Sequence, residues 1–212
     1  MPVNMIHTFM KRAMDIALSL SFIVFMSPVL IITMILIWVY DRHAPTYTQK
    51  RIGLNEEEFN FFKFRSMVVN ADDILFKDKE LYKQMRSGAN KVKDDPRVTP
   101  IGKFIRKYSI DEFPQAINVL RGEMSFIGPR ALRPDEYEEY ASQSDDNRRK
   151  LKIMTSVKPG VTGYWQVSGR SNITFDKRIN MECEYAKKKS ILFDCKILMQ
   201  TPLAVLRGDG AY

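Results

Sequence analysis

The sequence is poor in the residues from which many catalytic and metal sites are built. It has only two cysteines and two histidines in 212 residues. Cys183 and Cys195 are too far apart for a CxxC pair and have no histidine nearby, which argues against a zinc site and favours a reduced chain facing the cytosol. His7 and His43 lie away from any serine or cysteine constellation, which argues against a hydrolase triad. Carboxylates and arginines must therefore carry the chemistry.

Phosphate-binding fingerprints and repeats are also missing. The chain contains no GxxxxGK[ST] or GxGxxG motif, so a Walker or Rossmann site is not supported. It has no internal repeat and no low-complexity tract. The length suits one compact domain, and the net charge of +8, with a pI near 9.4, predicts an anionic partner. That partner could be a nucleic acid, an acidic membrane surface or a phosphorylated substrate, and charge alone does not choose among them.

Residues 16–40 contain no charged side chain, and this run is long enough to cross a bilayer. Ser27 and Pro28 interrupt it near the middle. Proline removes a helical hydrogen bond, so we expect a kink there, with the Ser27 hydroxyl bonding a backbone carbonyl that the kink frees. Basic residues flank the run on both sides: Lys11, Arg12, Arg42, Lys50 and Arg51. These flanks favour a hairpin that enters and leaves on one face, although the residues alone leave re-entrant and spanning forms open.

Adjacent carboxylates mark the stretch that we expect to hold the chemistry, residues 106–130. Asp111 and Glu112 lie there among cationic residues, and the stretch ends in the turn-forming triplet Gly128-Pro129-Arg130.

Pro114 helps to place these carboxylates. If Ser109 capped the following helix, Pro114 would fall in its interior and break a hydrogen bond. We therefore expect Asp111 to be the N-cap of a helix that runs to about Leu120, which would put Asp111 and Glu112 at a helix end that favours ionised carboxylates and binds phosphate. The simpler alternative is that Asp111 is only a cap and Glu112 only a first-turn charge.

The remaining elements follow from hydrophobic periodicity. Residues 46–51 and 59–64 should form paired strands around a turn at Gly53 and Asn55, with Lys63 and Arg65 on one face, a pattern more typical of a solvated surface than of a site. Helices are expected over residues 69–85, 101–107, 134–150, 176–189 and 191–206, the last broken at Pro202.

A glycine-rich segment, KPGVTGYWQVSGR at residues 158–170, surrounds Trp165. Glycines at this density indicate unusual backbone conformations or close approach by a ligand, and the tryptophan could stack on a base. A surface loop with a buried tryptophan is the plainer alternative.

Taken together, four motifs resemble those of the bacterial sugar transferase family of monotopic phosphoglycosyl transferases. They are KRAMDIALSLSFIVFMSP, FKFRSM, SIDEFPQAINVLRGEMSFIGPR and KPGVTGYWQVSGR, and the likeness extends from about residue 10 to about residue 206. The length is similar to that of the small form of the family, a catalytic core without the multi-pass N-terminal region.

This resemblance implies transfer of a phosphosugar from a UDP-sugar to undecaprenyl phosphate, a membrane polyprenol phosphate, with release of UMP. It implies that Asp111 is the nucleophile, that Glu112, with Asp111 beside it, holds Mg²⁺, and that the break at Ser27 and Pro28 is re-entrant. Phosphate-binding residues would be Arg65, Arg106 and Arg130, and nucleotide-binding residues would be Pro159, Gly160, Gly163, Trp165, Gln166, Gly169 and Arg170. Glu182 stands where the family pattern has aspartate.

We therefore expect a helix-rich α/β fold with a membrane anchor at residues 1–44, and at residues 45–212 a catalytic domain with interfacial helices around a small antiparallel hairpin. The expected location is the cytoplasmic face of the bacterial inner membrane, at the first membrane step of glycan, exopolysaccharide, O-antigen or glycoprotein assembly. Two other functions stay open: a membrane-tethered nucleic-acid-binding module, and a Mg²⁺-dependent nucleotide-sugar hydrolase. The favoured function requires membrane lipid and no nucleic acid, and the sequence identifies neither the sugar nor whether the chain forms a homo-oligomer.

Overall fold

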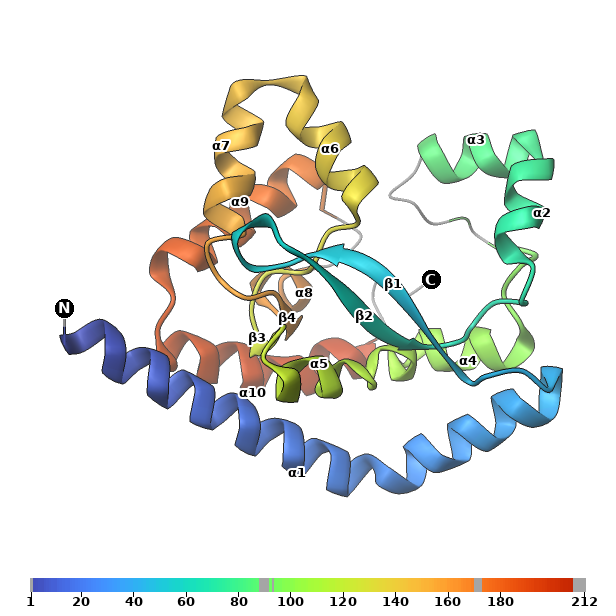
Figure 1. Ribbon diagram of the computed structural model, residues 1–212, viewed down its shortest axis with the longest axis horizontal. Helices are drawn as coiled ribbons and strands as arrows, with labels where there is room; N and C mark the ends of the chain where they lie inside the picture. The colour runs from blue at the N-terminus through green and yellow to red at the C-terminus, as the bar shows by residue number, and fades with distance from the viewer. Residues whose placement is uncertain (1, 88–91, 93, 170–172, 208–212) are drawn as a thin grey trace.

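A long helix lies beneath a helix-rich body that contains two small sheets (Figure 1). The computed structural model describes residues 2–87, 92, 94–169 and 173–207. In Figure 1 the long helix α1 runs along the lower edge, and α4, α5 and α10 lie directly above it. The expected helix-rich α/β fold with a small antiparallel hairpin is confirmed.

The long helix α1 spans Pro2–Asp41 and includes Pro28 in its interior. The chain stays helical through Ser27 and Pro28 and bends in its middle, as Figure 1 shows, so the expected helix-break-helix is one bent helix. The Ser27 hydroxyl donates to the Val24 carbonyl at 2.8 Å, which confirms the predicted compensation for the bond that proline removes.

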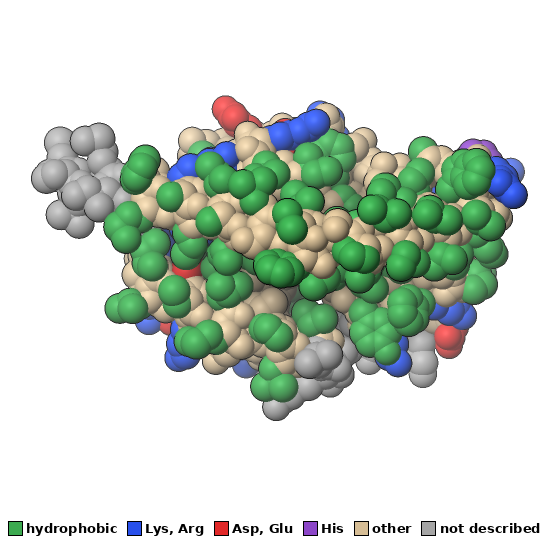
Figure 2. Space-filling model, turned by 90° about the horizontal axis from the view of Figure 1, so that it is seen from below, with side chains coloured by type: hydrophobic (Ala, Val, Ile, Leu, Met, Phe, Trp, Pro, Cys, Tyr) green, Lys and Arg blue, Asp and Glu red, His purple; other side chains and the backbone are tan. Residues whose placement is uncertain are grey.

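The apolar surface of α1 indicates membrane association. Within the described residues, Thr8–Asp41 is the one helix long and apolar enough to cross a membrane, with a mean hydropathy of 2.7 and only 11% of its most apolar window buried. Exposed apolar side chains also occur on the helices next to α1: Phe104 on α4, Ile117 on α5, and Leu192 and Met199 on α10. Figure 2, viewed from the side of α1, shows hydrophobic side chains spread over this face.

The N-terminal part of α1 is tied to the body by buried polar contacts. The Lys11 ammonium lies 3.0 Å from Asp15 and 3.1 Å from Asp194 of α10. Asp15 in turn accepts from the Ser125 hydroxyl at 2.9 Å and from the Phe126 backbone N–H at 3.0 Å. A basic residue expected to act only as a flanking charge is therefore part of a buried network that fixes the membrane helix to the body.

The hairpin forms as expected from β1 (Thr46–Ile52) and β2 (Glu58–Phe64), which pair antiparallel with Tyr47 opposite Lys63. The connection contains a short 3₁₀ turn, Leu54–Glu56, in which Asn55 adopts a left-handed conformation with φ 54°. Phe59, Phe61 and Phe64 of β2 are buried, so this strand carries much of the hairpin's packing.

A second sheet was not expected. Its strands β3 (Ser125–Ile127) and β4 (Gly160–Thr162) pair in parallel, which joins the Gly128-Pro129-Arg130 turn to the glycine-rich segment. A Cβ on Gly160 would lie 2.1 Å from the Gly128 nitrogen, and one on Gly163 would lie 2.2 Å from the Gly128 oxygen. Close approach of two backbones therefore accounts for these two glycines.

Two segments that were each predicted as one long helix form two shorter helices each. Residues 69–85 contain α2 (Ala71–Lys77) and most of α3 (Lys79–Ser87), because the Asp78 carboxylate accepts from the backbone N–H groups of Glu80 and Leu81. Residues 134–150 span α6 (Pro134–Gln143) and the start of α7 (Asp145–Met154), where Ser144 is the N-cap. The prediction of a break at Pro202 is wrong.

The other helices are α4 (Pro100–Lys107), α5 (Gln115–Arg121), α8 (Tyr164–Val167), α9 (Phe175–Lys188) and α10 (Ile191–Arg207), which contains Pro202. One apolar cluster joins α6, α7 and α9 with Ile52 of β1, and another joins β3, α9 and α10. Helix α9 is therefore shared by both clusters.

Candidate active site

Asp111 and Glu112 lie in a 3₁₀ turn, Ile110–Glu112, and not at the N-cap of a helix. Helix α5 begins at Gln115 with Pro114 as its N-cap, so the predicted capping role of Asp111 is wrong. The turn forms because Ser109 is left-handed, with φ 56°, and its carbonyl accepts from the Glu112 N–H at 3.2 Å. The turn, and not a helix N-terminus, therefore sets the direction of the two carboxylates.

Two cations hold these carboxylates. The Lys63 ammonium lies 3.3 Å from Asp111 Oδ2 and 2.9 Å from Glu112 Oε1. The Arg130 guanidinium binds Glu112 as a fork, with Nη1 3.1 Å from Oε2 and Nη2 2.7 Å from Oε1. Glu112 thus joins strand β2 to the turn after β3.

The electrostatics of the site keep Glu112 and Lys63 ionised. Burial opposes the charge of Glu112, but Arg130 and Lys63 outweigh it and hold the pKa of this carboxyl well below its usual range. Burial likewise opposes the charge of Lys63, yet Glu112 and Asp111 raise its pKa. The site therefore presents fixed charges of both signs in a desolvated setting, where they act strongly on a phosphate.

The predicted phosphate-binding arginines are not all brought together. Arg130 contacts Glu112, whereas the Arg106 Nε donates to Ser66 Oγ at 2.9 Å and Arg65 lies 3.8 Å from Asp41 at the end of α1. Lys63, which was not among the predicted site residues, is the cation that contacts both carboxylates. The available signal was its alternation with buried Phe61 on β2, which puts both side chains on one face.

The predicted nucleotide segment adjoins the site. Pro159 accepts from the Ser125 N–H at 2.8 Å, and Gln166 donates to the Val161 carbonyl at 3.1 Å. Trp165 lies in the short helix α8, with the Arg178 guanidinium carbon 4.5 Å from its ring centroid. Gly169 has φ 135°, a conformation that favours glycine, while Arg170 lies outside the described residues.

Glu182, on α9, connects to the site through Arg130. Its side chain is 0% exposed, and its Oε1 accepts from the Arg130 backbone N–H at 3.0 Å. Burial raises the pKa of Glu182 to about 7, against the effects of that N–H and of the Arg178 and Arg130 charges. The glutamate thus supports the turn that carries the Arg130 fork.

The two carboxylates suit a magnesium ion in chemical type. Among the described residues there is no group of three or more His, Cys, Asp or Glu side chains that could enclose a metal. Mg²⁺ in phosphoryl-transfer sites is, however, held by one or two carboxylates together with substrate phosphates and water. Asp111 and Glu112 match that donor set, and Lys63 engages Asp111 through Oδ2.

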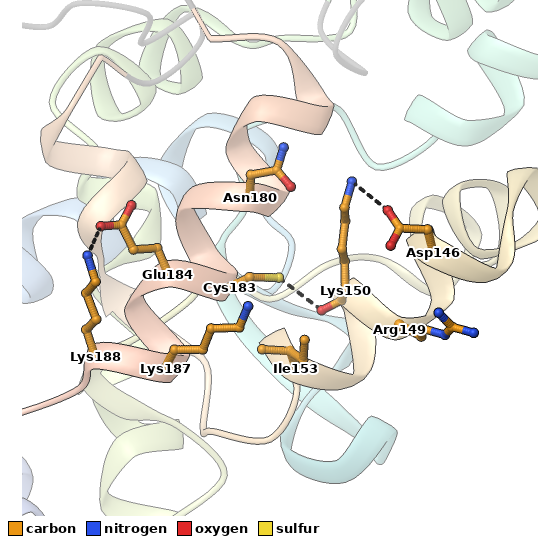
Figure 3. Close-up of a pocket in the computed structure, with 9 residues that line it drawn as sticks. All are labelled: Asp146, Arg149, Lys150, Ile153, Asn180, Cys183, Glu184, Lys187 and Lys188. Carbon is orange, nitrogen blue, oxygen red and sulfur yellow. Dashed lines mark hydrogen bonds and ion pairs between the residues drawn. The ribbon is translucent and has the colours of Figure 1, made fainter.

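A separate cavity of about 430 Å³ opens between α7 and α9 (Figure 3). Ile153 and Cys183 contribute apolar lining, and the Cys183 thiol donates to the Lys150 carbonyl. The charged rim is largely paired within itself, because Lys150 contacts Asp146 and Lys188 contacts Glu184. None of the predicted site residues lines this cavity.

Comparison with known proteins assigns the chain to a family. The sequence profile described as bacterial sugar transferase matches residues 6–208. The chain is 41% identical over 207 residues to the UDP-galactose-lipid carrier transferase of Erwinia amylovora, and 38% identical over 210 residues to the undecaprenyl-phosphate galactose phosphotransferase of Salmonella typhimurium. Each alignment covers 96% of this chain and 42% of the relative, so the chain spans less than half the length of these two proteins.

A shorter relative is the exopolysaccharide production protein ExoY of Sinorhizobium fredii. It is 36% identical over 206 residues, which cover 95% of this chain and 88% of the relative. The profile match, which spans nearly the whole chain, and these identities agree with the four motifs read from the sequence. The chain belongs to the bacterial sugar transferase family.

Proposed function

We propose that the protein transfers a sugar phosphate from a UDP-sugar to undecaprenyl phosphate, with Mg²⁺ as cofactor, and releases UMP. The observation that carries this proposal is the pair Asp111 and Glu112, buried and held by Lys63 and Arg130. Family membership supports it, as do two relatives whose names include a UDP-sugar, a lipid carrier and undecaprenyl phosphate.

In the first step an Asp111 oxygen bonds to the sugar-bearing phosphorus as the bond from that phosphorus to the UMP oxygen breaks. UMP leaves with the bonding electron pair, and the sugar phosphate stays on Asp111 as an acyl phosphate. Oδ1 is the attacking atom, because Lys63 holds Oδ2. Lys63 also reduces the repulsion between the nucleophile and the diphosphate.

In the second step the phosphate oxygen of undecaprenyl phosphate attacks the same phosphorus. The bond to Asp111 breaks, which regenerates the carboxylate and yields undecaprenyl diphosphosugar. Arg130 keeps Glu112 in place during both steps, because its fork fixes the orientation of that carboxylate. A Mg²⁺ ion bound by Glu112 beside Asp111 would neutralise diphosphate charge and polarise the phosphorus–oxygen bonds.

The apolar surface suits a lipid acceptor. Helix α1 and its neighbours α4, α5 and α10 expose apolar side chains, so the body would rest on one leaflet with the hairpin and carboxylates above it. We place the protein, as a monotopic protein, on the cytoplasmic face of the bacterial inner membrane, with both ends of α1 on that side. The bend at Pro28 and the basic residues on both flanks of the apolar run support this placement.

The test supplies purified protein with undecaprenyl phosphate, Mg²⁺ and a panel of UDP-sugars, beginning with UDP-galactose. We expect a lipid-linked sugar diphosphate and one UMP per transfer with at least one donor, and neither with Asp111→Asn. UMP turnover that proceeds without undecaprenyl phosphate would identify a nucleotide-sugar hydrolase instead. Salt-sensitive binding of oligonucleotides with no transfer would identify a nucleic-acid-binding protein.

A further inference from the structure

Arg178, on α9, is a buried cation that lacks an acidic partner. The residue is 9% exposed, and its Nε is buried with no hydrogen-bond acceptor. Within the described part of the chain its guanidinium makes no ion pair within 4 Å. Its close neighbours are aromatic, because the guanidinium carbon lies 4.5 Å from the ring centroid of Trp165 and 5.4 Å from that of Phe175.

Two further polar atoms beside Arg178 are buried without partners. They are Oε2 of Glu182, one helical turn along α9, and Nε1 of Trp165. Buried polar groups in folded proteins are nearly always hydrogen-bonded, and a group left without a partner costs free energy. Three such atoms around one guanidinium indicate that a polar ligand completes the arrangement.

The pattern of ion pairs indicates that this ligand is an anion. Around the turn after β3, Arg130 pairs with Glu112, Arg51 pairs with Glu136, and Arg133 pairs with Asp135 and Glu136, whereas no carboxylate of the described residues lies within 4 Å of the Arg178 guanidinium. Burial lowers the pKa of Arg178 to about 10; Glu182 and Glu136 oppose this effect and Arg130 adds to it. An oxyanion placed against Arg178 would relieve that repulsion, and the planar fork of arginine matches a phosphate.

The position of Arg178 indicates which of the two phosphates of the UDP-sugar it binds. It lies between Trp165, in the segment expected to hold the nucleotide, and Arg130, which reaches Glu112. In the proposed reaction the sugar-bearing phosphate is at Asp111, so the phosphate further along the diphosphate belongs to UMP. That phosphate gains a negative charge as the phosphorus–oxygen bond breaks, and a cation fixed by two aromatic rings is already oriented to meet it.

We propose that Arg178, fixed against Trp165, binds the phosphate of the departing UMP and stabilises the charge that develops there. This inference rests on the proposed function and adds a binding residue that the sequence motifs did not identify. Glu182 Oε2 and Trp165 Nε1 complete the same subsite as acceptor and donor for the nucleotide's polar groups.

Binding of radiolabelled UMP and of radiolabelled uridine to the full-length protein is measured by equilibrium dialysis in Mg²⁺ buffer. The wild type should bind UMP more tightly than uridine. Arg178→Met should weaken UMP binding by about tenfold or more, since it removes a charge-assisted hydrogen-bonding group, and should leave uridine binding within about twofold. Arg178→Lys keeps the charge without the fork, so its affinity for UMP should lie between those of the wild type and Arg178→Met. Arg149→Met, which removes a cation at the cavity between α7 and α9, is the matched control and should change neither ligand.

Equal loss of UMP and uridine binding in Arg178→Met would overturn the proposal, because the residue would then act on the fold or the nucleoside. Unchanged UMP binding in Arg178→Met would overturn it as well, with the transferase proposal left standing. If Arg178→Met does not fold, Arg178→Lys decides, and wild-type UMP affinity in that variant contradicts the phosphate contact. A wild type that binds neither UMP nor uridine would instead refute the nucleotide-dependent function itself.

Discussion

Replacing Glu182 by glutamine should stabilise the protein at neutral and alkaline pH. Folding raises the pKa of this carboxyl from 4.5 to about 7, because burial disfavours its charge. The contribution of this carboxyl to the free energy of unfolding of the wild type is therefore fully present below pH 4.5. It is lost as the pH rises through 7. A rise of this size corresponds to about 3 kcal/mol between the two limits. Glutamine keeps an oxygen that can accept from the Arg130 N–H but cannot ionise.

The assay is thermal unfolding of the wild type and Glu182→Gln in the same detergent from pH 4.5 to pH 8.5. The two melting temperatures should nearly coincide at pH 4.5, and the variant should be higher by about 6–10 °C above pH 7.5. Glu184→Gln is the matched control on the same helix, because its carboxylate is 42% exposed and pairs with Lys188, so no such gain is expected. A difference between Glu182→Gln and the wild type that stays constant with pH would refute the assigned burial effect.

Three other substitutions test separate parts of the structure. Lys63→Met should lower kcat by about a hundredfold or more in the transfer assay, because it removes the cation shared by both carboxylates; unchanged kcat would exclude that role. Pro28→Ala restores a helical hydrogen bond and should straighten α1. A cysteine introduced at Asn4 should be inaccessible from outside intact cells in the parent protein and should become labelled in Pro28→Ala. Labelling in the parent protein would contradict the re-entrant topology. Asp15→Asn should lower the free energy of unfolding by about 3 kcal/mol, because it leaves Lys11 with less compensating charge in a buried network. An unchanged melting curve would show that this network does not stabilise the fold.

The sequence predicted the hairpin and the single helices well, because local signals determine them. Alternating phenylalanines and the Gly53 turn define β1 and β2. Thr99, whose hydroxyl accepts from the Gly102 N–H, is the N-cap of α4, which begins at Pro100, one residue before the predicted start. The amphipathic residues 69–85 and the charged, weakly periodic residues 134–150 were each predicted as a single helix. Each break depends on a side-chain cap, at Asp78 or at Ser144. The sequence gives only a weak signal that such a cap, and not continuation of the helix, will form.

The candidate site was predictable in its carboxylates but not in its surroundings. Asp111 and Glu112 stand out as adjacent charges, whereas the cation beside them comes from a strand 48 residues earlier. Which of Lys63 and Arg65 reaches them depends on the register and twist of the hairpin; Arg65 was the predicted site residue, and Lys63 is the one that contacts the carboxylates. The parallel pairing of β3 with β4 joins segments with no shared periodic signal, so the role of Gly160 and Gly163 against Gly128 emerged only from the structure.

The most direct test of Asp111 as the nucleophile is intact-protein mass spectrometry after incubation with a UDP-sugar and Mg²⁺ in the absence of undecaprenyl phosphate. We expect one sugar-phosphate adduct per chain, located at Asp111 by peptide mapping, with a matching burst of UMP and with loss of the adduct when undecaprenyl phosphate is added. Asp111→Asn should form neither adduct nor burst, because the amide keeps the shape but not the attacking charge. An adduct that persists in Asp111→Asn, or transfer that requires both substrates bound together, would show that Asp111 is not the nucleophile.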